Sequence, residues 1–447
     1  MTQTVPAAAP APAPAPGQVQ APGQARGPSP AAPGARAQRT RRGAQDTPGR
    51  LRLVSAALIV VALSVGLGAA QSFWAADGAL ARADANAAQL VRLQDIQTKL
   101  VRADADATNA FLVGGLEQPA QRRDYDQAIE RASAQVAFAA RAQPADGEVL
   151  AALSTSILTY TGMVEQARAI NRQGLPLGAQ YLRDGSAGLR ADALPLMEAL
   201  NKANEHRVAV EFANARTARN LAIAAALVGL VVVGGALVWL ARRSHRYVNV
   251  PVAASGLVVL AILVVSAVAL GSVASAVKDV RTGSYAAARA LASARIAAFD
   301  AKANESLTLI SRGSGAAFET AWKAASGTTT SDLDVAVSVG GADAGLPTSW
   351  TTYTVLHQKI RARDDGGAWD KAVAAAVSRA AGSANAAFDA FDNASEQRLT
   401  HAGDATSSGL RDAESGLTFG AWLAVLAGIL AASLAWWGLS QRIEEYR

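Results

Sequence analysis

The sequence predicts an all-α membrane protein with four transmembrane helices and two tandem-duplicated extracytoplasmic helical bundles. The first observation is a set of four apolar stretches without Asp, Glu, Lys, Arg or His, at residues 53–76, 221–240, 250–277 and 416–440. Each reaches the ~20 residues that a helix needs to cross a bilayer. The second observation is that two long polar segments of helical periodicity separate these stretches in pairs.

The order of these stretches divides the chain into two copies of one pattern, span–domain–span. The segments are a Pro/Ala-rich basic cytoplasmic tail (1–50), transmembrane helix 1 (53–76), extracytoplasmic bundle 1 (77–220), transmembrane helix 2 (221–240), a cytoplasmic loop (241–249), transmembrane helix 3 (250–277), extracytoplasmic bundle 2 (278–415), transmembrane helix 4 (416–440) and a cytoplasmic tail (441–447). The first tail holds 10 of the 16 prolines and no aromatic residue, so we expect it to be disordered.

The distribution of charge predicts on which side of the membrane each segment lies. Residues 1–52, 241–249 and 441–447 together carry 12 Lys and Arg against 3 Asp and Glu, whereas the two long domains carry 30 against 33. Basic residues close to membrane spans stay on the cytoplasmic side. We therefore expect a multi-pass protein of the cell membrane with both termini in the cytoplasm. The net charge of +6 is a topology signal and does not argue for nucleic-acid binding.

Apolar residues recur at helical spacing in the first long domain. Leu93, Ile96 and Leu100 recur at intervals of three and four, which marks one buried helix face. Glycine and proline then end each predicted helix. Further helices are expected over 121–142, 147–172 and from 178 towards the second span, the last with an interruption at Pro195. Strand-like alternation is limited to Asp332–Val339.

The two domains resemble each other, which indicates an internal duplication. Three segment pairs match in the same order: Asp104–Leu112 with Asp300–Thr308, Thr159–Thr161 with Thr352–Thr354, and Asn201–Arg207 with Asp392–Arg398.

The duplicated positions supply the candidate ligand- or partner-binding residues, Tyr160 and Arg168 in the first domain and Tyr353 and Arg361 in the second. A spacing of eight places each Tyr and Arg on roughly one face of a helix. Because Arg can hold a carboxylate with two hydrogen bonds, an amino-acid ligand between helices is one interpretation. The alternative is that the tyrosines pack at the bundle edge and the arginines are solvated.

No catalytic chemistry can be assembled from the sequence, so we expect a non-enzymatic protein without a metal or cofactor. The chain has no cysteine, and its four histidines, at 206, 245, 357 and 401, lack the i,i+4 partners of a metal site. The glycine pairs lack the Lys-Ser or Lys-Thr of a phosphate-binding loop. The absence of ionisable groups within the spans disfavours an ion-coupled transporter.

Small residues recur every four positions in three spans: Ala62/Gly66/Ala70, Ala267/Gly271/Ser275 and Ala424/Gly428/Ala432. This pattern lets helix backbones approach closely in lipid, so it predicts helix contacts within the membrane.

The layout over residues 50–447, together with the segment Ala103–Gly115, resembles the GlnX-type four-span membrane proteins of actinobacteria. Proteins of this family are encoded beside protein kinase G and a glutamine-binding-type lipoprotein. The resemblance implies a signal relay, in which an extracytoplasmic solute-binding lipoprotein or an amino-acid ligand acts through this protein on a cytoplasmic Ser/Thr protein kinase. The rich use of Ala and Arg fits an actinobacterial source.

Two other functions stay open on the sequence. One is an accessory or permease-like subunit of an amino-acid transport system, and the other is a structural envelope protein. In each case the lipid bilayer is a partner, nucleic acid is not, and a homo-oligomer is compatible with the sequence.

The charge pattern makes a direct prediction of topology. Reporter fusions at Ser244 should be active only as cytoplasmic reporters, and fusions at Gly174 and Gly366 only as extracytoplasmic ones. An extracytoplasmic signal at Ser244 would overturn the predicted orientation.

Overall fold

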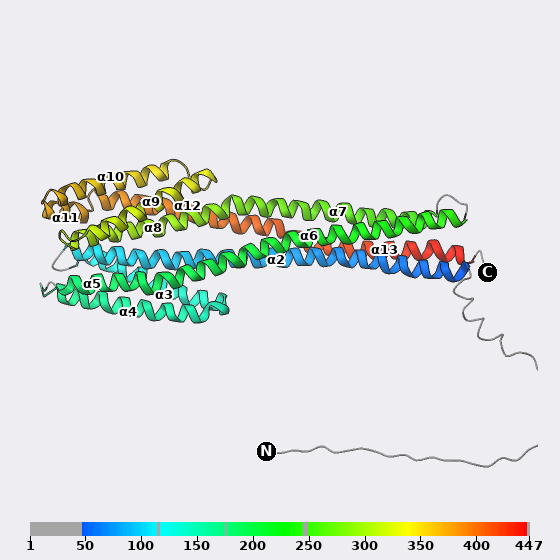
Figure 1. The fold of residues 1–447 in the computed structure, drawn as a ribbon, viewed down its shortest axis with the longest axis horizontal. Coiled ribbons are helices and arrows are strands. Elements are labelled where there is room, and N and C mark those ends of the chain that lie inside the picture. The colour runs from blue at the N-terminus through cyan, green and yellow to red at the C-terminus, as the bar shows by residue number, and fades with distance from the viewer. Residues whose placement is uncertain (1–46, 114–116, 174, 176, 245–248, 445–447) are drawn as a thin grey trace, which may run out of the picture. The chain divides into compact units, whose positions relative to one another are not determined.

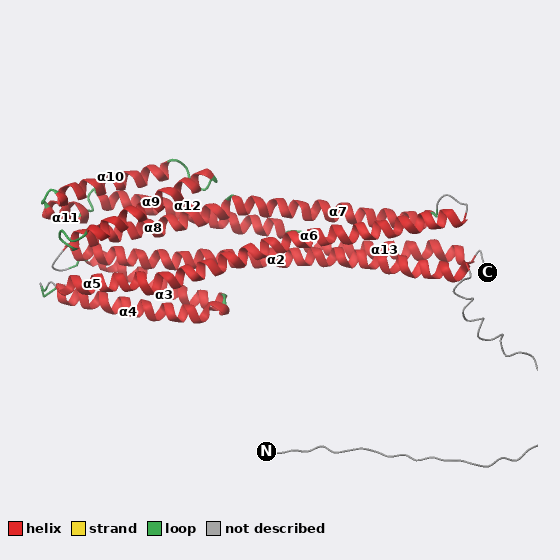
Figure 2. Ribbon diagram, in the orientation of Figure 1, coloured by secondary structure: helices red, strands yellow, loops and turns green. Residues whose placement is uncertain are grey.

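In a computed structural model of the protein, the described residues form helices joined by short loops, with no strand among them (Figure 2). The structure describes residues 47–113, 117–173, 175, 177–244 and 249–444. Residues 54–447 form one compact unit. The other unit, residues 1–53, is described only from residue 47, as the first turns of α2. The predicted disorder of the tail therefore lies outside the described residues.

Four long helices contain the predicted spans and lie side by side along much of their length (Figure 1). They are α2 (Thr47–Val113), α6 (Leu194–Ser244), α7 (Val250–Thr282) and α13 (Leu417–Glu444). Four helical stretches are long and apolar enough to cross a membrane: Gly49–Val113, Leu177–Arg242, Val250–Ile310 and Ala384–Gln441. The all-α fold class with four membrane-compatible helices is thus confirmed.

The surface of these helices is suited to lipid. Only 22–39% of the most apolar part of each is buried within the protein. Val231, Leu257 and Leu426 are 74%, 67% and 61% exposed. A soluble protein rarely exposes apolar side chains in continuous bands, so the bands indicate a multi-pass membrane protein.

Two of the three small-residue patterns bring spans together. A Cβ atom on Gly66 of α2 would lie 2.6 Å from the Cα atom of Gly428 of α13, so the backbones touch at this point. Nearby, Ser255 Oγ of α7 donates to the Ala431 carbonyl of α13 at 2.8 Å. The third pattern does not make the predicted contact, because a Cβ atom on Gly271 would meet nothing within 4 Å.

Bundle 1 is the helical region between residues 77 and 220. It comprises the second half of α2, α3 (Pro119–Ala142), the short η1 (Pro144–Asp146), α4 (Gly147–Asn171), α5 (Leu177–Gly188), η2 (Leu189–Ala193) and the start of α6. Leu93, Ile96 and Leu100 are fully buried in its core, as their spacing predicts. The predicted helix breakers Gly114 and Gly115 lie outside the described residues.

Bundle 2 is the helical region between residues 278 and 415. It comprises α8 (Ser284–Ile310), α9 (Ala316–Ser338), α10 (Gly345–Asp365), α11 (Trp369–Val377) and α12 (Ala384–Glu414). Its core is more aromatic, with Trp350, Tyr353, Phe388 and Phe391 packed against one another. The same core cluster includes Val101 of α2, so the two bundles share a continuous apolar contact.

The expectation of strand-like structure near residue 332 is wrong. Asp332–Val339, interpreted as strand-like, begins within α9, which runs to Ser338. Thr329, Leu333 and Ala336 are buried on one face of that helix. Their spacing of four and three is the helical period, and packing of this face outweighs the preference of Thr and Val for strands.

In both halves a matching arginine pairs with an aspartate that shortly precedes a helix of the bundle. Arg207 Nη2 of α6 lies 2.6 Å from Asp146 Oδ1, just before α4. Arg398 of α12 likewise contacts Asp343, just before α10. Since Arg207 and Arg398 end the third matching segment pair, the repeated contact favours the predicted duplication.

The close contact of Gly66 with Gly428 predicts a local sensitivity to side-chain size. Gly66→Leu should lower the stability of the purified protein in detergent by about 1–3 kcal/mol, because the added side chain must force α2 and α13 apart. Gly271→Leu is the matched control and should change the unfolding midpoint little, since its Cβ position is open. Equal midpoints for the two variants would contradict the packing of these spans.

Candidate site coupling the two bundles

A π-helical segment, η2, interrupts the helix that leads from α5 into α6. The N–H of Leu194 donates to the carbonyl of Leu189, five residues back instead of four. Pro195 follows directly and has no N–H to continue the α-helical pattern. The interruption predicted at Pro195 therefore takes the form of a π segment, a feature often found at functional sites.

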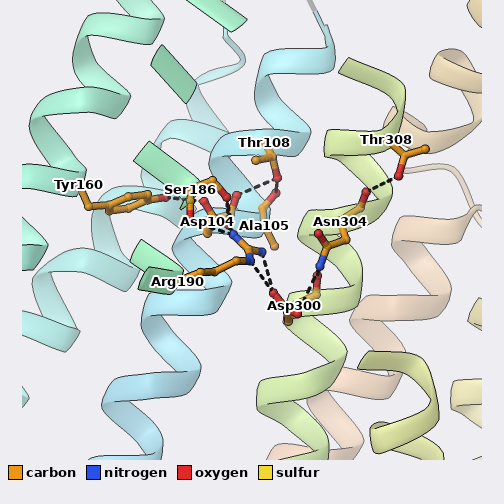
Figure 3. A network of polar contacts seen from close by, with 9 residues as sticks. All are labelled: Asp104, Ala105, Thr108, Tyr160, Ser186, Arg190, Asp300, Asn304 and Thr308. Carbon is orange, nitrogen blue, oxygen red and sulfur yellow. Dashed lines mark hydrogen bonds and ion pairs between the residues drawn. The ribbon is translucent and has the colours of Figure 1, made fainter. Parts of the chain in front are cut away.

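Arg190 lies in this segment and joins the two bundles (Figure 3). Its Nη1 atom lies 2.7 Å from Asp104 Oδ2 on α2, and its Nη2 atom lies 2.6 Å from Asp300 Oδ1 on α8. Nε also donates to Asp300 Oδ1, at 3.0 Å. Asp104 and Asp300 are matching positions of the two halves, so one guanidinium binds both copies of the same residue.

The first half of this site is deeply buried. The Asp104 side chain is 1% exposed and also accepts hydrogen bonds from Ser186 Oγ at 2.7 Å and Tyr160 Oη at 3.3 Å. Burial opposes the charge on Arg190, but the two carboxylates outweigh it and raise its pKa above the ordinary value. Burial, together with Asp104, raises the pKa of Tyr160 well above its ordinary value, so its hydroxyl is a donor at neutral pH.

The second half of the site is more open. The Asp300 side chain is 28% exposed and accepts a hydrogen bond from Asn304 Nδ2 at 3.2 Å. Asn304 Nδ2 also donates to the Asp300 carbonyl at 2.8 Å, which fixes the two side chains along α8 (Figure 3). Arg190 is thus held tightly to bundle 1 and reaches a more exposed carboxylate on bundle 2.

A second polar network lies inside bundle 2. Glu305 on α8 is fully buried, with Lys302 Nζ at 2.6 Å and His357 Nδ1 at 2.9 Å. His357 also faces Glu319 at 3.3 Å and stacks on Trp322, with ring centroids 3.6 Å apart. Burial alone would raise the pKa of Glu305, but Lys302 and His357 outweigh it and lower the pKa to about 2. Burial opposes the charge on His357, yet its two carboxylates raise its pKa.

The four sequence-predicted site residues are not brought together. Tyr353 Oη donates to Glu305 at 3.3 Å, and Arg361 Nε lies 3.4 Å from Glu319, so both belong to the bundle 2 network. Tyr160 belongs to the Arg190 site in bundle 1. Both tyrosines are fully buried core residues rather than edge residues.

Arg168 lies apart from that site, over the ring of Tyr125 and paired with Glu117 at 3.0 Å and Glu165 at 2.8 Å. It is 10% exposed, so it is not a solvated arginine. It lines a cavity of about 240 Å³ between the helices of bundle 1, together with Arg122 and Arg172. Its role as a binding residue stays a prediction.

Sequence reasoning missed Arg190, which no motif or repeat match distinguishes. A partial signal was present, since Asp104 and Asp300 were matched and Pro195 was recognised as an interruption. Sequence reasoning also treated His357 as an isolated histidine, although the structure places it between Glu305 and Glu319. Among the described residues, no group of three or more His, Cys, Asp or Glu side chains is placed to hold a metal ion.

Comparison with known proteins gives one match. Residues 79–213 match the family model of the actinobacterial sensor domain. The matched region covers bundle 1 and includes Asp104 and Arg190, but it ends before Asp300. It supports a sensor protein of actinobacteria. No curated protein and no solved structure matches the chain.

The unequal burial of the two aspartates predicts unequal costs of breaking the bridge. Arg190→Ala leaves the Asp104 charge buried and should lower stability by about 3 kcal/mol. Asp300→Asn should lower the free energy of unfolding by less than about 1 kcal/mol, because water can replace this more exposed partner of Arg190. Chemical unfolding of the purified variants in detergent measures both. An equal or reversed order would contradict the described geometry.

Proposed function

We propose that the protein is a transmembrane signal relay. The observation that carries the proposal is the Arg190 bridge between matching aspartates of the two bundles. Asp104 lies on α2, which continues without a break into the first span. Asp300 lies on α8, which follows α7 after the single turn at Gly283. A change at the bridge is therefore transmitted to two different spans.

The mechanism requires two arrangements of the bundles that differ in free energy by a few kcal/mol. A ligand or partner that prefers one arrangement shifts the helices by ~1–2 Å, as in other helix-shift switches. The π segment supports this proposal, since it places Arg190 where the helical hydrogen bonding is already irregular. Bundle 1, which carries the sensor-domain match, is the proposed input.

The proposed partners follow from the resemblance noted in the sequence. An extracytoplasmic amino-acid-binding lipoprotein, or an amino acid itself, acts on the bundles, and a cytoplasmic Ser/Thr protein kinase receives the signal. A bound partner is needed because only the two tails and the short loop are expected on the cytoplasmic side. A permease-like role has less support, since the spans hold no ionisable residue for a transport pathway.

The relay predicts a defect that is separate from protein abundance. In the native host, Arg190→Gln should blunt the change in kinase-substrate phosphorylation that follows external Asp or Glu, because the bundles are uncoupled. Arg131→Gln is the matched control, since Arg131 is an exposed arginine on α3. Immunoblotting confirms equal amounts of protein, and Asp300→Asn serves as a second, milder uncoupling variant.

Deletion of the gene gives the sharper comparison. If a deletion strain responds to external Asp or Glu like the wild type, the amino-acid relay is wrong. If Arg190→Gln and Arg131→Gln respond alike at equal abundance, the Arg190 bridge is not the coupling element.

A further inference from the structure

A cavity of about 640 Å³ opens between the two bundles, with Arg190 on its wall. Residues of α2 and α6 line one side of it, and residues of α8 and α9 line the other. It is separate from the bundle 1 cavity beside Arg168. Because its two walls belong to the two halves of the duplication, any occupant would touch both.

Three residues that line these walls each hold a buried oxygen atom without a hydrogen-bond partner in the described part of the chain. The atoms are Gln94 Oε1 on α2, Asn201 Oδ1 on α6 and Asp332 Oδ2 on α9. A buried polar atom without a partner costs about 1–3 kcal/mol, so such atoms are rare unless a ligand or water satisfies them. Three of them around one cavity, drawn from both bundles, indicate a site for an occupant that donates hydrogen bonds.

The carboxylate of Asp332 sets the chemistry of that occupant. The Gln94 amide can be turned to present either its oxygen or its nitrogen. Asn201 Nδ2 already donates to Gln97 Oε1 at 2.8 Å, so Asn201 offers its oxygen as an acceptor. The ionised carboxylate of Asp332 can only accept hydrogen bonds. Its pairing with a charged donor would give the stronger class of hydrogen bond.

The arginines on the walls are already neutralised. Arg190 is shared by Asp104 and Asp300, and Arg289 Nη2 lies 2.8 Å from Glu205 Oε1. No cation among the described residues pairs with Asp332, so a negative charge remains at the cavity. An anionic ligand would meet this charge and find both nearby arginines occupied, which disfavours a carboxylate or a phosphate here.

We propose that this cavity binds a small organic cation with a primary ammonium group, of the aliphatic amine class. The ammonium pairs with Asp332, and the amides of Gln94 and Asn201 accept its remaining hydrogens. The ligand holds α9 of bundle 2 against α2 and α6 of bundle 1, beside the Arg190 bridge. This inference goes beyond the proposed relay and does not need the amino-acid partner to be correct.

The test is calorimetric titration of the full-length protein in nanodiscs of zwitterionic phosphatidylcholine, with putrescine as the probe. Zwitterionic lipid avoids adsorption of the amine to anionic headgroups. Putrescine should bind, and Asp332→Asn should weaken its binding about tenfold or more, because a charge-assisted hydrogen bond is lost. Asp332→Asn removes an unpaired charge, so its thermal unfolding midpoint should stay the same or rise.

Two controls make the result specific. Asp334→Asn removes an exposed carboxylate from the same helix, outside this cavity, and should leave putrescine binding unchanged. Butane-1,4-diol, which replaces the ammonium groups of putrescine by hydroxyl groups, and glutarate, a dicarboxylate of similar length, should both bind at least tenfold more weakly than putrescine. The proposal is overturned by absence of putrescine binding at millimolar concentration, by equal loss in the two aspartate variants, or by glutarate or diol binding as tightly as putrescine.

Discussion

An arginine bound by one carboxylate from each bundle joins the two halves of this protein, beside the ion pairs Arg102–Asp392 and Arg289–Glu205. Arg190 is bound at once by Asp104, which is almost fully buried, and by Asp300, which is partly open to solvent. A buried carboxylate needs a positive partner, so Arg190 cannot leave Asp104 without a large cost. It can exchange Asp300 for water at a much smaller one. The contact of Arg190 with Asp104 is therefore costly to break, whereas its contact with Asp300 can be exchanged for water.

Apolar packing accompanies this bridge between the bundles. The bundles meet through small and apolar residues, including Val101 and Ala105 of α2 in the core cluster of bundle 2. Such a contact is close but carries few directional bonds, so polar contacts such as the Arg190 bridge fix its register. Within bundle 2, the Glu305–His357 network is fully internal and stiffens that half without crossing to the other. Polar coupling between the halves runs through cross-bundle ion pairs, among them Arg190–Asp300 and Arg102–Asp392.

The sequence predicts the helices better than it predicts the site. Uncharged stretches and three-and-four spacing are direct consequences of burial in lipid or in a helical core, so the spans and the face of Leu93, Ile96 and Leu100 could be predicted. The strand-like interpretation of Asp332–Val339 failed because local preference was weighed without knowing what Leu333 packs against. Tyr160 and Tyr353 were singled out as repeated positions, but their partners Asp104 and Glu305 could not be known from the sequence. No motif distinguishes Arg190 itself in the sequence, since its role depends on two aspartates 86 and 110 residues away.

The most direct test of the coupling is a distance measurement between the bundles. The chain lacks cysteine, so Thr159→Cys and Thr352→Cys, at exposed matching positions of α4 and α10, place one spin label on each bundle. Double electron–electron resonance in nanodiscs should give a narrow distance distribution when Arg190 is present. It should give a broader or shifted distribution in the Arg190→Ala variant. An unchanged distribution in that variant would contradict the account that Arg190 sets the arrangement of the two halves.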